Sequence, residues 1–367
     1  MMLIDRPRKI KLKSTTLCLP YKESARHALW KKMSLLVCLL SGRDSLSLQG
    51  ISIEAQNIIC ESWRAGTNQQ YNTYLKRWQV FCSGRGIDPL LVYVKDILDF
   101  LVELYNTGLK YSAIGTARSA LSNCVKLVDS TCVVGEHPLV SRFLKGVFEL
   151  RPSLPRYKQI WDVKIVLNYL EKLSPNEDLS LLDLSTKLVT LLAIVSGQRC
   201  QSLHVIKTCD MIFETNRILI PINSIIKQSK PNKTQPVMVL PVFYNQNLCV
   251  VRTMKEYLNR TEIFRCEKEN RELFLTTVKP YLPASKSTIS RWIKTALSKA
   301  GIDVNIYSAH STRAASTSAA ARILPLTSIM KAAGWTNSRT FQRFYNVPNN
   351  DDNEANDFAT TVLNLNS

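Results

Sequence analysis

Two residues in the second half of the chain, His310 and Arg313, have the types and spacing of an anion site. Residues three apart lie on the same face of a helix, so the imidazole and the guanidinium can reach one oxyanion together. Their neighbours, Ala309 and residues 314–316, are small and leave room for a close partner. A lone histidine near a helix start is usually structural and a lone arginine usually solvated. The pair, in this setting, indicates a site that binds an oxyanion.

Three further features lie before and after this pair. Gly197 is predicted to end an apolar helix, so that Arg199 is presented at a turn. Trp335 follows a glycine, and Tyr345 ends the segment Thr340 to Tyr345. Taken alone, Trp335 is expected in the core and Tyr345 has no special role. The order of these features along the chain is what carries information.

That order resembles the signature of the tyrosine recombinase (phage integrase) family. In this family an arginine after a helix, a lysine on a β-hairpin, a His-x-x-Arg helix, a histidine or tryptophan after glycine and a terminal tyrosine follow one another. The resemblance extends from about residue 60 to about residue 348. It implies a mostly α-helical fold with a small β-sheet: a helical, SAM-like core-binding domain followed by a mixed α+β catalytic domain.

The resemblance also implies an activity, the cleavage and rejoining of DNA with Tyr345 as the nucleophile in a 3′-phosphotyrosine intermediate. Arg199 and Arg313 would stabilise the charge of the transition state. His310 would accept or relay the phenol proton, and the indole N–H of Trp335 would donate to the phosphate. This chemistry requires no metal, and no cofactor is expected.

The lysine of the signature is ambiguous in this sequence. Lys227, Lys230 and Lys233 all lie between two predicted strands. Lys227, at the strand end, is favoured as the general acid that protonates the leaving 5′-oxygen, and Lys230 is second. Tyr345 follows Trp335 by ten residues, one more than is usual in bacterial and phage members. The tyrosine helix is therefore expected to enter the site by a slightly different route.

Within the family, three strings are most similar to recombinases of DIRS-like and Crypton-like mobile elements. They are Trp-Arg-Ala-Gly-Thr at 63–67, Ser-Gly-Gln-Arg-Cys at 196–200 and Ser-Ala-His-Ser-Thr-Arg-Ala at 308–314. Residues 27–41 also resemble the linker that precedes such recombinases. The resemblance thus predicts a protein derived from a mobile element, located in the nucleus and acting as a homotetramer on paired DNA sites.

The sequence predicts two domains that position these residues. Residues 1–52 are expected to be a basic extension or linker with one helical patch at 27–40. Residues 53–152 are expected to form the helical core-binding domain, which binds DNA. Pro152 and Pro155 mark the boundary, because proline interrupts helices. Residues 158–348 are expected to be the catalytic domain, and 349–367 a C-terminal tail.

Hydrophobic periodicity predicts the elements of the first domain. Thr67 and Gln70 have the spacing of a capping box at the start of a helix. One apolar stripe then follows at helical spacing, formed by Tyr71, Tyr74, Leu75, Trp78 and Phe81. Three more helices are predicted at about 92–105, 112–128 and 138–150. Four helices with short connections make a small helical domain.

The second domain is predicted to be mixed. Helices are expected at 163–173 and 181–195, followed by strands near 211–213, 217–221 and 236–243, where β-branched residues and proline or asparagine replace the helical spacing. Five helices are expected after that, at about 249–258, 287–300, 308–321, 325–333 and 338–345.

The charge of the chain indicates a polyanionic partner. Lysine and arginine number 48 against 29 acidic residues, a net charge of +19. Double-stranded DNA is the expected partner, held by both domains as a clamp, mostly through phosphates and with strong salt dependence. The candidate DNA-binding residues are Arg64, Lys76, Arg77, Lys110 and Arg118 in the first domain, and Lys207, Lys230, Arg291 and Lys294 in the second.

Cysteine and apolar patterns argue against other classes. The 10 cysteines include no C-x-x-C pair, so a zinc site is not expected, and their apolar surroundings are typical of a reducing compartment. The longest apolar runs, 33–40 and 188–195, are far shorter than the roughly 20 residues that a membrane helix needs. No membrane association is expected.

Three alternatives remain open on the sequence alone. The chain could be a catalytically inactive or domesticated DNA-binding protein of the same fold, because a sequence does not show that the residues meet. It could be a type IB topoisomerase, which shares the tyrosine, arginine and histidine chemistry but relaxes DNA without a partner site. A nucleic-acid chaperone would explain the charge but not the ordered motifs.

Overall fold

A computed structural model describes residues 52–153, 157, 159–232, 234–266, 271–335 and 337–345 of the 367-residue chain. The predicted helical patch at 27–40, almost all of the predicted extension, the predicted tail and Lys233 lie outside these residues. The chain divides into two compact units, Met1–Leu154 and Pro155–Ser367. Each unit has its own hydrophobic core.

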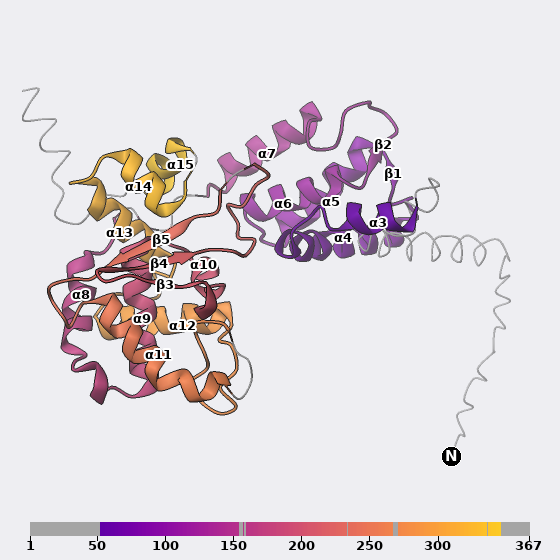
Figure 1. The fold of residues 1–367 in the computed structure, drawn as a ribbon. Coiled ribbons are helices and arrows are strands. Elements are labelled where there is room, and N and C mark those ends of the chain that lie inside the picture. The colour runs from indigo at the N-terminus through magenta and orange to yellow at the C-terminus, as the bar shows by residue number, and fades with distance from the viewer. Residues whose placement is uncertain are drawn as a thin grey trace, which may run out of the picture. The chain divides into compact units, whose positions relative to one another are not determined.

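The first unit is helical, with one two-stranded sheet among its described residues (Figure 1). Its strands pair in parallel, with Leu91 opposite Lys126 and Val92 opposite Leu127. The elements are α3 (Ile53–Cys60), α4 (Ala65–Arg85), β1 (Leu91–Val92), α5 (Val94–Asn106), α6 (Tyr111–Ser122), β2 (Lys126–Leu127) and α7 (Pro138–Leu150).

Helix α4 carries the predicted apolar stripe into the core of this unit. Leu75, Trp78 and Phe81 are buried, and Trp78 stacks on Phe81 with ring centroids 5.5 Å apart. The indole N–H of Trp78 donates to the Pro89 carbonyl at 2.9 Å, so the buried polar atom of the ring is satisfied. The helix ends at Gly86, whose φ of +68° is a conformation that glycine adopts without strain.

Three details of the first unit differ from the sequence prediction. The capping box at Thr67 is wrong, because α4 already begins at Ala65 with Arg64 as its N-cap. The helix predicted over 112–128 ends at Ser122, and the chain then forms β2. Helix α3 was not predicted. Its N-cap is Ser52, whose hydroxyl accepts from the Ala55 N–H at 3.3 Å.

The second unit contains all the predicted catalytic residues. Its described elements are α8 (Val163–Lys172), η1 (Asn176–Asp178), α9 (Leu181–Ser196), α10 (Cys200–His204), η2 (Thr208–Asp210), β3 (Ile212–Phe213), β4 (Arg217–Pro221), β5 (Val237–Pro241), α11 (Val250–Cys266), α12 (Lys286–Lys299), α13 (Ser311–Ala321), α14 (Leu326–Ala333) and α15 (Ser338–Phe344). Helix α11 is longer than predicted, because the chain stays helical past Leu258.

Helix α9 is the central helix of this unit. It is buried on nearly every face, and it contacts α8, α10, α11, α12, α13 and β5. A helix that is buried on nearly every face is typical of the interior of a larger domain. The hydroxyl of Ser180 caps its start by accepting from the Asp183 N–H at 3.1 Å. Gly197 ends it in the left-handed region, at φ +58°.

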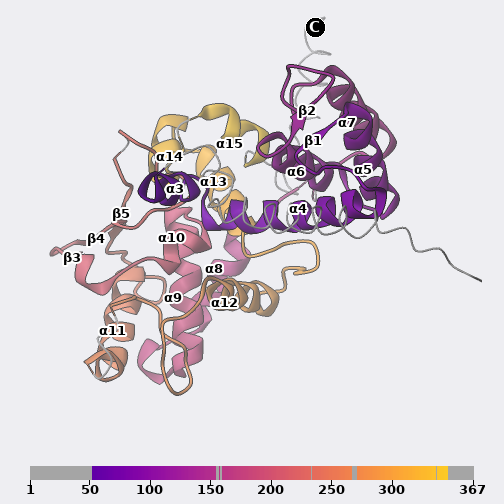
Figure 2. The same cartoon turned by 90° about the vertical axis from the view of Figure 1, so that its right-hand side faces the viewer.

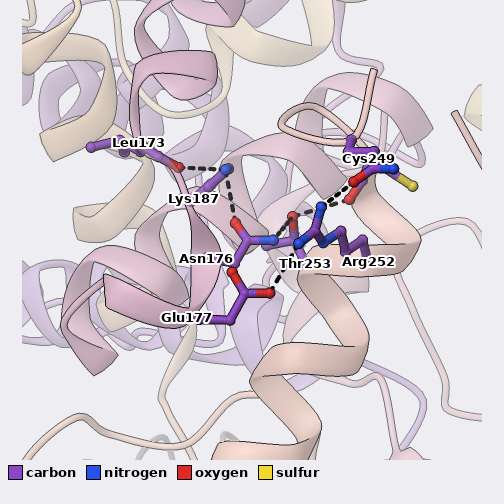
Figure 3. A network of polar contacts seen from close by, with 8 residues as sticks. Leu173, Asn176, Glu177, Lys187, Cys249, Arg252 and Thr253 are labelled. Atoms are coloured by element: carbon purple, nitrogen blue, oxygen red, sulfur yellow. Dashed lines mark hydrogen bonds and ion pairs between the residues drawn. The ribbon is translucent and has the colours of Figure 1, made fainter. Parts of the chain in front are cut away.

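One charged residue of α9, Lys187, lies completely inside the protein (Figure 3). Its ammonium donates to the Leu173 carbonyl at 2.5 Å and to Asn176 Oδ1 at 2.8 Å. The Asn176 amide in turn donates to the Thr253 hydroxyl at 3.3 Å. This polar network links α9 with η1 and α11.

The sheet of this unit has the order β3-β4-β5, with both pairs antiparallel. Ile218 and Ile220 of β4 and Met238 and Leu240 of β5 are buried, while the residues between them are more exposed. This alternation is expected for a sheet with one face on the core. In both views, α14 and α15 lie together at one end of the unit and α11 at the other (Figures 1 and 2).

The predicted fold class is confirmed. The described residues are mostly helical with two small sheets. In the second unit the strands follow α8 to α10 and precede α11 to α15 along the chain, as predicted. Within the described residues, no helix is both long and apolar enough to span a bilayer.

Candidate active site

Arg199 is positioned by the end of α9. After the left-handed turn at Gly197 the chain resumes as α10, and Arg199 is the N-cap residue of that helix. The residue is half-buried, and its Nη1 donates to Oε1 of Gln228 at 3.3 Å. The predicted turn before Arg199 is therefore present, and it directs the guanidinium toward the loop between β4 and β5.

His310 and Arg313 lie at the start of α13. His310 is the N-cap residue and Arg313 lies in the first turn, among buried small residues such as Ala314 and Ala315. The Arg313 side chain has no exposed surface. Its Nη1 donates to the Gly197 carbonyl at 2.5 Å and its Nη2 to the Ala333 carbonyl at 2.8 Å. The guanidinium thus joins the C-terminal ends of α9 and α14.

Trp335 and Tyr345 complete the surroundings of Arg313. Helix α14 ends at Gly334, with φ +71°, and Trp335 follows it. The Arg313 Cζ lies 4.2 Å from the Trp335 ring centroid and 5.3 Å from that of Tyr345. Both distances are within the range of cation–π attraction. The Trp335 and Tyr345 rings are themselves 4.7 Å apart, centroid to centroid.

The hydroxyl of Tyr345 contacts the imidazole of His310. The distance from Nε2 of His310 to the tyrosine oxygen is 3.0 Å. Tyr345 is the residue directly after α15, and its carbonyl accepts from the Ser318 hydroxyl of α13 at 2.5 Å. Both the side chain and the backbone of Tyr345 are therefore held against α13, the helix that carries Arg313.

The cations of the site keep His310 neutral. Burial of the imidazole, followed by the charges of Arg199, Arg313 and Lys227, lowers the pKa of His310 to about 4. A neutral imidazole has a lone pair for the tyrosine proton. Burial and the charge of Arg199 lower the pKa of Arg313 to about 9, which leaves it charged at neutral pH.

The hairpin lysines occupy the loop between β4 and β5. Lys227 is exposed and directly precedes Gln228, which accepts from Arg199, so it lies beside the site. Lys230 is exposed on the same loop, and Lys233 lies outside the described residues. The structure therefore brings Arg199, Lys227 and His310 together with the Arg313, Trp335 and Tyr345 cluster.

The predicted DNA-binding residues have different environments. Arg64, Lys76, Arg77 and Lys110 are exposed in the first unit, and Lys230, Arg291 and Lys294 are exposed in the second. Arg118 is half-buried, and its Nη1 donates to the Gly135 carbonyl at 3.3 Å. Lys207 is half-buried, and its backbone pairs with Glu272 in an isolated β-bridge. Arg118 thus has a structural contact with the backbone of its own unit.

Two glutamines of the site were not identified from the sequence. The Gln198 side chain is buried and donates to the Ala332 carbonyl at 2.9 Å, and Gln228 accepts from Arg199. Gln198 lies within the motif that ends in Arg199, and Gln228 is adjacent to Lys227. Adjacency to a predicted catalytic residue was the only signal in the sequence, since a glutamine has no diagnostic spacing.

Unpartnered polar atoms concentrate at this site. Seven buried side-chain nitrogen or oxygen atoms of the described residues have no hydrogen-bond partner, and four of them lie here. They are Oε1 of Gln198, Nε2 of Gln228, Nε of Arg313 and Nε1 of Trp335. Three of these four are donors, so the site has unused capacity to bind an acceptor.

Metal ligands are not gathered at the site. Over the described part of the chain, no group of three or more histidine, cysteine, aspartate or glutamate side chains could hold an ion. The charged groups near Tyr345 are cations, namely Arg199, Lys227 and Arg313. Such a set binds anions rather than metal ions.

Comparison with known proteins identifies the family. The Phage integrase family model matches residues 164–351, more than half of the chain, and the chain therefore belongs to this family. The matched range includes all six residues of the site from Arg199 to Tyr345. No match is found among curated proteins.

Two solved structures illustrate the shared fold. The chain is similar to the XerH site-specific recombinase in a post-cleavage complex with a palindromic difH substrate, at 15% identity over 81% of this chain and 80% of that chain, with a TM-score of 0.56. It is also similar to the Tn1549 transposon integrase in complex with transposon right end DNA, at 12% identity over 86% and 94%, with a TM-score of 0.53. At such low identities the likeness concerns the fold.

Proposed function

We propose that this chain is a site-specific DNA recombinase or integrase that cleaves and rejoins DNA through a 3′-phosphotyrosine on Tyr345. The observation that supports this most directly is the 3.0 Å contact between the Tyr345 hydroxyl and Nε2 of His310, beside the guanidinium of Arg313. A nucleophile, a base and a charge stabiliser are thus adjacent, which is the arrangement that covalent catalysis requires.

The unpartnered donors provide a second line of support. Nε of Arg313, Nε1 of Trp335 and Nε2 of Gln228 are buried without acceptors. A buried donor without a partner costs on the order of 1–3 kcal/mol, so three such donors at one site suggest that an acceptor arrives with the substrate. A phosphate, with several oxygen acceptors and negative charge, is the ligand that suits two guanidiniums and an indole.

The proposed cleavage step balances as follows. The Tyr345 oxygen attacks the phosphorus and transfers its proton to the neutral His310. The bond from phosphorus to the 5′-oxygen breaks, and that oxygen takes a proton from the Lys227 ammonium. Arg199 and Arg313 neutralise the charge that develops on the phosphoryl oxygens. Attack by a 5′-hydroxyl on the phosphotyrosine reverses the sequence and rejoins the strand without external energy.

Access of DNA to Arg313 requires a movement in this proposal. Because Arg313 has no exposed surface, a phosphate can reach its guanidinium only if a neighbouring side chain moves. We propose that the Tyr345 ring moves, since it lies 5.3 Å from the guanidinium carbon and directly follows α15, a helix of only seven residues. This movement would expose the guanidinium to the phosphate, and the tyrosine oxygen would then attack the phosphorus from the side of the vacated space.

The proposal extends to partners and origin. Double-stranded DNA is the proposed substrate, with exposed Lys76, Arg77 and Lys110 of the first unit and Arg291 and Lys294 of the second as phosphate contacts. Strand exchange needs two cleaved duplexes, and closed symmetric assemblies are the usual solution, so we propose a homotetramer on paired sites. The short strings that resemble DIRS-like and Crypton-like recombinases support a mobile-element origin and a nuclear location.

Covalent capture tests the proposed function. The full chain is incubated with a pool of duplexes that carry a randomised segment and one nick, so that the short strand released on cleavage diffuses away and traps the adduct. Adducts are separated by denaturing gel electrophoresis, and the attached DNA is sequenced. The wild-type chain is expected to form an adduct, and Tyr345→Phe is expected to form none, while binding in a gel-shift assay stays within about threefold.

A matched tyrosine provides the control. Tyr307 lies just before α13, and its hydroxyl donates to the Gln159 carbonyl at 3.0 Å, so Tyr307→Phe should retain the adduct. An adduct that persists in Tyr345→Phe would mean that another residue is the nucleophile. DNA binding without an adduct from the wild type would favour the inactive or domesticated DNA-binding protein. Relaxation of single plasmids without exchange between two captured duplexes would favour a topoisomerase.

A further inference from the structure

The loop between β4 and β5 places Lys227 and Gln228 at the tip of a tight turn. The Ser229 N–H donates to the Ile226 carbonyl at 2.9 Å, and the Ile226 N–H donates to the Ser229 hydroxyl at 3.0 Å. The Ile226 side chain is buried and anchors the start of the turn. Lys227 and Gln228 are therefore the two central residues of a turn that is closed on itself, and they project from it.

Gln228 is the residue of this turn that contacts the rest of the site. Its Oε1 accepts from Nη1 of Arg199 at 3.3 Å. Its carboxamide also lies against the backbone of Gly334, where an added Cβ would come within 2.9 Å of the Gln228 Cδ. The side chain thus bridges the end of α9 and the end of α14. Lys227, in contrast, has no hydrogen bond or ion pair within the described residues.

The orientation of the Gln228 amide follows from Arg199. A guanidinium has no acceptor, so the amide must direct its oxygen to Arg199 and its nitrogen toward Gly334. In that orientation Nε2 is buried without a partner. An amide that leaves a donor unsatisfied is destabilising by itself. Its bridging position therefore suggests a role other than stabilising the fold.

We propose that Gln228 is a positioning residue for leaving-group protonation. It holds the turn of residues 226–229 against Arg199 and Gly334, and so keeps the ammonium of Lys227 beside the scissile phosphate. This inference rests on the proposed function, because it assumes that Lys227 protonates the 5′-oxygen. Gly334 is part of the device: it provides the side-chain-free surface on which the carboxamide lies, in a backbone conformation that suits glycine.

The chemistry of the leaving group offers a specific readout. When the bond from phosphorus to the 5′-oxygen breaks, the alkoxide needs a proton, which Lys227 supplies. If sulfur replaces the bridging 5′-oxygen, the bond breaks to give a thiolate, which is stable without a proton because thiols are far more acidic than alcohols. A defect in proton delivery is therefore rescued by the sulfur substrate, whereas a defect in attack or in charge stabilisation is not.

The experiment compares single-turnover adduct formation on two forms of one captured nicked duplex, with 5′-oxygen or 5′-sulfur at the scissile bond. Gln228→Met, which keeps the length of the side chain and removes its hydrogen bonds, is expected to slow cleavage of the oxygen substrate about 10- to 100-fold. On the sulfur substrate it should cleave within about threefold of the wild type. Gln228→Glu, which keeps an acceptor for Arg199, should recover part of the rate on oxygen.

A double-mutant cycle separates positioning from a general structural effect. If Gln228 acts through Lys227, then Lys227→Ala combined with Gln228→Met should be no slower on oxygen than Lys227→Ala alone. Gln246 is the matched control, since it also accepts from an arginine, Arg252, outside the site. Gln246→Met should leave the ratio of the rates on oxygen and sulfur unchanged.

Hydrogen exchange in the full-length protein without DNA tests the tether directly. Amides of residues 226–229 should exchange faster in Gln228→Met than in the wild type. In Lys227→Ala they should exchange at the wild-type rate, because the Gln228 contact remains. Any one of three results would overturn the positioning role. These are equal rate losses of Gln228→Met on the oxygen and sulfur substrates, additive rate effects of the two substitutions, and unchanged amide exchange in Gln228→Met. Absence of any wild-type adduct on either substrate would instead overturn the proposed function, and with it this inference.

Discussion

Among the described residues of the second unit, two cations are fully withdrawn from solvent, Lys187 in the middle of α9 and Arg313 in α13. Both donate to backbone carbonyls: Lys187 to Leu173, and Arg313 to Gly197 and Ala333. The buried polar side-chain atoms around Lys187 all have hydrogen-bond partners (Figure 3). Around Arg313, by contrast, several buried donors and one acceptor are unpartnered.

This contrast separates a charge that serves the fold alone from one that, in the proposed function, also binds a ligand. A charge buried for the fold has its hydrogen bonds completed by the protein, because an incomplete set destabilises the folded state. A charge buried for catalysis is held in place by part of its donors and leaves the rest for a ligand. Burial alone does not separate Lys187 from Arg313, but the state of their neighbours does.

The largest expected contrast is between substitutions of these two residues. Arg313→Lys keeps a positive charge but cannot serve two carbonyls and a phosphate together, since an ammonium lacks the planar fork of the guanidinium. We expect the single-turnover rate of adduct formation to fall about 100- to 1,000-fold. Circular dichroism and thermal unfolding would show whether the fold is retained. A rate within about threefold of the wild type would remove Arg313 from the proposed chemistry.

A second prediction concerns the state of His310. Burial, followed by the charges of the surrounding cations, lowers its pKa from the ordinary 6.5 to about 4, so the imidazole should stay neutral as the pH falls from 8 to 6. Adduct formation at subsaturating DNA should therefore not decline across this range on account of His310. With saturating DNA the phosphate charge should raise this pKa, and the decline should begin at higher pH.

Nuclear magnetic resonance of the histidine side chains measures this pKa directly. The chain has four histidines, and the signal that disappears in His310→Gln assigns the residue. Lys227→Ala should raise the pKa of His310, because it removes one of the repelling charges. An imidazole that titrates near 6.5 in the wild type would contradict the proposed charge cluster. His310→Gln itself should slow cleavage about 100-fold.

The helices and the order of the motifs could be predicted from the sequence because they depend on local patterns. The stripe that includes Trp78 and Phe81 and the turn at Gly197 are both present in the structure. Errors arose where tertiary packing decides the outcome. Helix α4 extends two residues before Thr67, and the parallel pairing of Leu91–Val92 with Lys126–Leu127 ends the α6 segment early.

For the site, the sequence could predict the residue types but not their contacts. Gln228 is brought to Arg199 across 29 positions of sequence, and no local spacing encodes that distance. The sequence also does not indicate that Arg313 is fully buried rather than accessible, because its burial depends on the Trp335 and Tyr345 rings. Both the Gln228–Arg199 contact and the burial of Arg313 depend on long-range packing, which local sequence patterns do not encode.

The smallest expected effect on activity, and the sharpest test of the comparison, comes from Lys187→Met. Adduct formation should stay within about twofold, since Lys187 belongs to no part of the site. The substitution should instead change how the free energy of unfolding depends on pH. Burial, with the charge of Arg252, lowers the pKa of Lys187 from 10.5 to about 8, so between these values the unfolded chain binds more protons than the folded one.

Stability from this group is therefore complete above pH 10.5 and is lost as the pH falls through about 8. Between pH 7 and about pH 9.5, the free energy of unfolding of the wild type should rise by up to about 2 kcal/mol relative to Lys187→Met. Urea denaturation of both proteins at the two pH values measures this difference. A pH-independent difference would show that Lys187 keeps an ordinary pKa, and a large loss of adduct formation in Lys187→Met would show that the two buried cations are coupled rather than distinct.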